Sequence, residues 1–179
     1  KNIYIILIME ISKKEPVTYN QRLLSTFDNY FTSSHILLAG WCSVSLLFFI
    51  LAFNSSVSIN INIVNGPGYQ YIDSLKCFPE INIRCNIDNM AKTMEQNDIA
   101  FCSAGRTIYE LASIGVPSIV LTHNERENNH LFATQEYGFF NLGLSEFVEK
   151  EDVLNTYIQL VENYQLRKHR DSLLKLIIK

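Results

Sequence analysis

Basic residues are few in this sequence, and they do not cluster. Fifteen Lys and Arg residues stand against eighteen Asp and Glu residues, so the 179-residue chain carries a net charge of −3. Proteins that follow a nucleic-acid backbone usually present a basic stripe. The lack of one argues against nucleic acid as a partner. The length fits one domain, or one domain with an appendage.

Cysteine is also scarce, and its spacing matches no metal site. The four cysteines are Cys42, Cys77, Cys85 and Cys102. They form no C-x2-C pair and lie mostly in apolar segments, which predicts reduced, buried thiols in a cytoplasmic protein. His123 and His130 stand seven residues apart without a third ligand at metal spacing. We therefore expect no metal site and no cofactor.

Charge is absent altogether between Asp28 and Asp73. Within this stretch, residues 36–53 form a run of eighteen apolar-leaning residues, which is near the lower limit for crossing a bilayer. Gly and Ser interrupt the run, and no Lys/Arg cluster flanks it to set an orientation. Three interpretations stay open: a buried hydrophobic segment, which we favour, a membrane span, and a reading-frame error or artificial join.

Strand-like and helix-like patterns alternate along the rest of the chain. The expected strands are residues 3–9, 57–63, 81–85, 99–102, 118–121 and 139–141. The expected helices are residues 19–30, 69–77, 89–96 (with Asp88 as its N-cap), 107–114, 127–137, 150–163 and 165–178. This alternation predicts an α/β fold with a Rossmann-like, doubly wound parallel sheet. We divide the chain into an atypical N-terminal segment, 1–56, and an α/β domain, 57–179.

A loop of small residues joins the expected strand 99–102 to the helix at 107. It reads Ser103-Ala104-Gly105-Arg106. The N–H groups and positive dipole end of such a helix suit a phosphate group, and the Arg106 guanidinium can grip two phosphate oxygens. Thr107 and Glu110 also fit a capping box, which binds helix N–H groups and no ligand. Both interpretations stay open, because the loop lacks the full G-x-G-x-x-G spacing.

Several spaced blocks follow one another in the second half of the chain. They are Asn86-Ile87-Asp88-Asn89-Met90-Ala91, Asn97-Asp98-Ile99-Ala100, Ser103-Ala104-Gly105-Arg106-Thr107-x-x-Glu110, Gly115-Val116-Pro117, His123-Asn124-Glu125-Arg126-Glu127-Asn128-Asn129 and Asn141-Leu142-Gly143. In this order they resemble the nucleotide-sugar-binding, C-terminal half of the GT-B glycosyltransferases. The chain is similar to the family 28 domain of lipid II-forming N-acetylglucosamine transferases. It is at least as similar to the UDP-sugar hydrolases of pseudaminic acid synthesis and to spore-coat polysaccharide proteins.

The resemblance implies a nucleotide site. The loop around Ile87 would hold uracil through backbone groups. Glu110 would accept hydrogen bonds from the ribose hydroxyls. The residues that would face the diphosphate are Ser103, Gly105, Arg106 and Thr107.

The resemblance also implies a sugar site. Asn128 and Asn129 would bind sugar hydroxyls, because amides both donate and accept hydrogen bonds. Asn124 is a weaker candidate, which a solvated loop position explains equally well.

No catalytic residue is assigned. In GT-B relatives the acid/base residue comes from an N-terminal domain with a Gly-rich loop, and this chain has no counterpart of it. The resemblance implies a UDP-sugar-binding domain of a glycosyltransferase-type protein of cell-surface polysaccharide synthesis, which needs that N-terminal domain or a partner subunit for turnover. A UDP-sugar hydrolase and a truncated, non-catalytic binding module are the alternatives, with a UDP-sugar 2-epimerase more distant. We expect a cytoplasmic location, with membrane association as an alternative.

Overall fold

The computed structural model describes residues 5–11, 59–66, 73, 81–85, 87–129 and 131–177. The strands in these residues are β1 (Ile5–Ile11), β2 (Ile59–Asn65), β3 (Ile81–Cys85), β4 (Ile99–Cys102), β5 (Ser118–Thr122) and β6 (Phe140–Leu144). The helices are α4 (Met90–Glu95), α5 (Thr107–Ile114), α6 (Glu125–Asn128), α7 (Lys150–Glu162) and α8 (Tyr164–Ile177). The hydrophobic run 36–53 and the expected helices 19–30 and 69–77, apart from Asp73, lie outside the described residues.

The six strands form one sheet in the order β3-β2-β1-β4-β5-β6, which is the strand order of the Rossmann fold. The α/β, Rossmann-like fold class is thereby confirmed. The pairs β2–β3, β4–β5 and β5–β6 are parallel. The central strand β1 is antiparallel to both β2 and β4, whereas a parallel sheet was expected throughout. A period-2 apolar pattern is the same in either direction, so it carries no information on strand direction.

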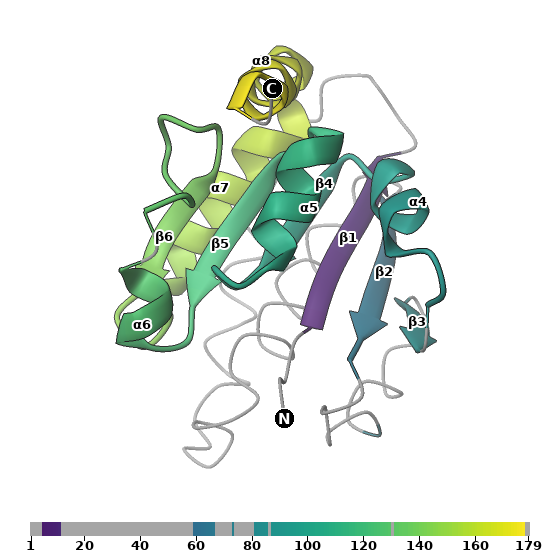
Figure 1. Cartoon of the computed structure of the whole chain (residues 1–179), viewed down its shortest axis with the longest axis horizontal. Coiled ribbons are helices and arrows are strands. Elements are labelled where there is room, and N and C mark those ends of the chain that lie inside the picture. The colour runs from purple at the N-terminus through teal and green to yellow at the C-terminus, as the bar shows by residue number, and fades with distance from the viewer. Residues whose placement is uncertain are drawn as a thin grey trace, which may run out of the picture.

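Helices cover both faces of the sheet (Figure 1). Phe101 and its neighbours on alternate strand positions pack against α7, where the Phe101 and Tyr157 ring centroids lie 5.8 Å apart. The intervening positions, such as Ala100 and Val120, pack against the inner side of α5 and against Leu174 of α8. These strands are therefore buried on both faces, as expected for a sheet between two helical layers.

The sequence predicted α5, α7 and α8 to within a residue or so, but two other helices differ. The N-cap of α4 is Asn89 and not Asp88, because the Asn89 side chain accepts a hydrogen bond from the Lys92 N–H at 2.9 Å. The helix expected at 127–137 was wrong: α6 is a short helix that begins at Glu125 and ends at Asn128. The described residues after it, 131–139, form turns instead.

None of the helices within the described ranges is long and apolar enough to cross a bilayer. The apolar run 36–53 belongs to the rest of the chain, so this finding does not bear on it.

Candidate functional site

The carboxyl ends of β4, β5 and β6 meet at one edge of the sheet, because these strands run parallel. The N-terminal end of α5 and the whole of α6 lie at the same edge (Figure 1). The Ser145 N–H donates to the Thr122 carbonyl at 2.9 Å, which joins the loops after β6 and β5. Ligands of open α/β sheets bind at this edge.

The N-terminus of α5 has no side-chain cap. Arg106 already has helical dihedral angles, with φ −63° and ψ −27°, and its carbonyl accepts the Tyr109 N–H at 3.1 Å. Thr107 therefore lies inside the helix, where its hydroxyl cannot act as an N-cap. No side-chain cap hydrogen bond is present at this end, so the capping box that the sequence allowed for Thr107 and Glu110 as one of two interpretations is not formed.

The residues expected to face a diphosphate are adjacent to one another around this helix end. Arg106 and Glu110 are both exposed and, four residues apart, lie on the same side of the helix. Ser103 and Gly105 are half-buried, and a Cβ atom at Gly105 would stand 3.6 Å from the Ser103 hydroxyl. The loop therefore packs against the protein, while the side chains of Arg106 and of Glu110 on α5 are exposed.

A capping box does occur at this edge, on α6. The Asn124 side chain accepts a hydrogen bond from the Glu127 N–H at 3.0 Å, and the Glu127 carboxylate accepts one from the His123 N–H at 3.0 Å. The arrangement is a variant of the capping box, because the second bond comes from the residue before the N-cap, and it fixes the start of the helix in the same way. The Asn124 side-chain oxygen is therefore engaged within the protein, which weakens its candidacy as a sugar contact.

Asn128 and Asn129 lie at the other end of α6 and are exposed. The hydroxyl of Thr122, a buried residue, lies 3.5 Å from the Asn128 side-chain oxygen and donates to it. A Cβ atom at Gly143 would lie 3.9 Å from that same oxygen. Asn128 is thus held over the carboxyl ends of β5 and β6.

Two site residues were not singled out in the sequence, Thr122 and Glu127. Burial, and secondarily the charge of Glu127, raise the pKa of the Cys102 thiol to about 12. The Glu127 side chain is half-buried at this edge, where its carboxylate accepts the His123 N–H at the start of α6. The Asn124-x-x-Glu127 spacing was the available signal, since it has the form of a capping box.

The other half of the expected nucleotide site is the loop before α4. Ile87 is half-buried and packs against the core cluster that contains Met94 and Ile108. Asn86 lies outside the described residues. The strand β3 runs in the same direction as β4, because β2 and β4 are both antiparallel to β1 and β3 is parallel to β2. The loop after β3 therefore lies at the same edge of the sheet as the loop before α5.

The thiols and histidines differ in their surroundings. Cys102 is buried, as expected, but Cys85 at the end of the edge strand β3 is exposed, which corrects the prediction for that residue. His123 is exposed, and His130 lies outside the described residues. In the part of the chain that the structure describes, no three His, Cys, Asp or Glu side chains are grouped to hold a metal ion.

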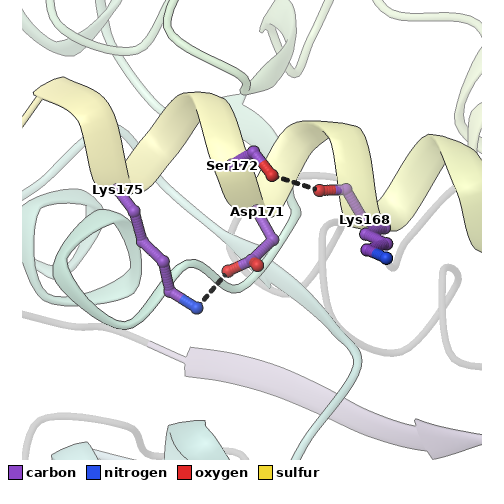
Figure 2. A network of polar contacts seen from close by, with 4 residues as sticks. All are labelled: Lys168, Asp171, Ser172 and Lys175. Carbon is purple, nitrogen blue, oxygen red and sulfur yellow. Dashed lines mark hydrogen bonds and ion pairs between the residues drawn. The ribbon is translucent and has the colours of Figure 1, made fainter.

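A hollow lies at the opposite end of α5 and is not part of this site. It is lined by residues of α4, the last turn of α5 and α8, among them Lys92, Glu95 and Lys175. Lys175 forms an ion pair of 2.6 Å with Asp171 on α8 (Figure 2). The two groups are half-exposed, so the pair contributes little to stability.

Together, the fold and the edge loops define a Rossmann-like α/β domain whose helix α5 begins, without a side-chain cap, at the carboxyl edge of the sheet. Residues 54–172 match the family described as glycosyltransferase family 28 C-terminal domain. This match covers well over half of the chain, and the chain belongs to that family.

Two relatives match part of the chain. The uncharacterized protein MJ1062 of Methanocaldococcus jannaschii is 42% identical over 73 residues, which cover 37% of this chain and 15% of that protein. The spore coat polysaccharide biosynthesis protein SpsG of Bacillus subtilis is 30% identical over 90 residues, covering 50% of this chain and 26% of that protein. The chain thus matches about a quarter or less of either relative's length. No solved structure matches the chain.

Proposed function

We propose that this domain binds a UDP-sugar at the carboxyl edge of its sheet. The observation that carries the proposal is the N-terminus of α5, which has no side-chain cap and has Arg106 beside it. The positive end of the helix dipole, the backbone N–H groups of the loop before it and a guanidinium together suit a diphosphate. Family membership supports the same conclusion, because glycosyltransferases take activated sugars as donors.

The proposed nucleotide site extends from the loop at Ile87 to the first turn of α5. The backbone near Ile87 contacts uracil, and the diphosphate lies against Ser103, Gly105, Arg106 and Thr107. Glu110 accepts hydrogen bonds from the ribose hydroxyls, a role for which its exposure and its position one turn beyond Arg106 are suitable.

The proposed sugar site is the C-terminal end of α6. Asn128 and Asn129 present amides there, and the Thr122 hydroxyl donates a hydrogen bond to the side-chain oxygen of Asn128. This contact supports a role for Asn128 as a donor to a sugar hydroxyl through its side-chain nitrogen. Asn124 contributes mainly through the cap that holds α6 in place.

We propose further that the domain serves a glycosyltransferase-type protein of cell-surface polysaccharide synthesis. The similarity to a spore coat polysaccharide biosynthesis protein supports this role. An N-terminal GT-B domain or a partner subunit would supply the acid/base group and the acceptor site. The α/β domain, residues 57–179, would then act as the donor-binding half.

UDP is expected to bind more tightly than UMP, CDP or ADP. The second phosphate adds a charge-assisted contact at Arg106, and the loop at Ile87 selects the base. We expect a preference for UDP over UMP of about tenfold or more, measured by titration calorimetry at fixed ionic strength. The melting temperature of the protein should rise with UDP, since a ligand that binds only the folded state stabilises it.

Two outcomes would contradict this prediction in different ways. Equal affinity for UDP and ADP would contradict the assignment of the Ile87 loop to uracil but would remain consistent with the proposed phosphate site. A lack of binding by every nucleotide tested would remove the proposed function itself.

Replacing Glu110 with glutamine is expected to weaken UDP binding roughly tenfold to a hundredfold, because a charged acceptor for the ribose is lost. The melting temperature should stay unchanged, since Glu110 caps no helix in the structure. Glu95→Gln, an exposed carboxylate of α4 in the opposite hollow, is the matched control and should bind UDP normally. A variant with intact UDP affinity and a lowered melting temperature would instead favour the capping box.

A further inference from the structure

An aromatic contact joins the two halves of the proposed site. Tyr109 belongs to the first turn of α5, and Phe132 lies three residues after Asn129. Their ring centroids are 4.4 Å apart with an interplanar angle of 30°, so the two rings are in contact in a tilted arrangement. The Tyr109 side chain is 43% exposed, so its ring covers Phe132 from the solvent side.

Phe132 is in turn anchored in the core. Its ring lies 5.7 Å from that of Phe139, which is fully buried, and 5.8 Å from that of Tyr137. The Asn141 side-chain amide also donates to the Ala133 carbonyl at 2.8 Å. The described segment after α6 is therefore attached to β6 at Ala133 and to α5 at Phe132.

We infer that Tyr109 is a positioning residue, which sets the place of Asn128 and Asn129 relative to the phosphate loop through Phe132. This inference rests on the proposed function. The phosphate loop is covalently continuous with α5 and keeps its own backbone contacts, such as that from the Ile108 N–H to the Gly105 carbonyl at 3.4 Å. The amide pair lacks such a direct link to α5.

The consequence is a selective effect on the sugar. Without the Tyr109 ring, the segment that follows α6 loses its contact with α5, and the two amides adopt a wider range of positions. The contacts to the nucleotide are unaffected, because the phosphate loop and Glu110 are held by the chain of α5 itself and not by the contact between Tyr109 and Phe132. Tyr109 thus influences the affinity for the sugar without touching it.

The test compares UDP with UDP-N-acetylglucosamine in wild-type protein and in Tyr109→Ala. We expect the affinity for the nucleotide sugar to fall about threefold to tenfold, which is the usual size of an aromatic pair contribution, while UDP affinity changes less than about twofold. Tyr109→Phe keeps the ring and should restore the wild-type ratio. Tyr164→Ala removes a tyrosine of similar exposure, 48%, from α8 and should leave both affinities unchanged.

Two further measurements separate positioning from general destabilisation. In a variant that already carries Asn128→Ala and Asn129→Ala, removing the Tyr109 ring should have no further effect on the nucleotide-sugar affinity. Amide hydrogen exchange in Tyr109→Ala should become faster at residues 128–133 and stay the same at residues 103–107. Unchanged exchange at residues 128–133 would overturn the inference whichever sugar the protein takes, whereas a wild-type protein that binds no UDP would overturn the proposed function.

Discussion

Replacing Arg106 with alanine is expected to weaken UDP binding about tenfold to a hundredfold while changing uridine binding less than about twofold. The range corresponds to the loss of charge-assisted hydrogen bonds worth roughly 1.5–3 kcal/mol. Arg106 is exposed at the uncapped end of α5, so its guanidinium is free of the packing that would make its removal destabilising. Uridine lacks phosphates, so its affinity should not depend on the Arg106 side chain.

Calorimetry with UDP, UMP and uridine measures this prediction. Lys168→Ala removes an exposed positive charge from α8, far along the chain from the site, and serves as the control for a general change in net charge. Arg106→Lys keeps the charge but not the planar fork and should give an intermediate affinity. Parallel losses for uridine and UDP would mean that Arg106 acts on the fold and not on phosphate.

Replacing Gly138 with alanine is expected to destabilise the protein by about 2–5 kcal/mol. Gly138 has φ +98°, a backbone region that costs other residues roughly 1–2 kcal/mol. A Cβ atom there would also lie 3.0 Å from the Leu174 Cγ and 3.1 Å from the Arg170 carbonyl oxygen. Leu174 is fully buried, and overpacking at such a site costs roughly 1–3 kcal/mol more.

Urea unfolding of the two proteins measures the difference in the free energy of unfolding. Gly105→Ala is the matched control, because a Cβ atom there meets only the Ser103 hydroxyl at an ordinary 3.6 Å. We expect the stability of that variant to stay within about 1 kcal/mol of wild type. An equal loss of stability in both variants would contradict the prediction. It would mean that the close approach of α8 does not explain the glycine at position 138.

Local patterns predicted most of the elements around the site. The strand β4 and the helix α5 have the predicted bounds, and α7 and α8 differ by a residue or so. Each has a clear apolar period and recognisable ends. For α5 the end is Gly115, which adopts a left-handed conformation with φ +87° and closes the helix.

The errors occurred where distant contacts decide the structure. The segment after α6 contains enough apolar residues for a helix, but Phe132 and Phe139 instead bring their rings together across turns. Asp88 and Asn89 are both good capping residues, and only the backbone conformation selects Asn89. The direction of β1 likewise depends on its neighbours, β2 and β4, and not on its own alternation.

The candidate site likewise combines features that the local sequence predicts with features that only distant contacts decide. The order of residues from Ser103 to Glu110 was enough to place a charged loop before a helix, because strand, loop and helix are consecutive and each is locally encoded. The bond from Thr122 to Asn128 and the bond from the Ser145 N–H to the Thr122 carbonyl exist only in the folded chain. They depend on β5 and β6 lying side by side with their carboxyl ends at one edge, and such a register is set by packing between residues that are far apart in sequence.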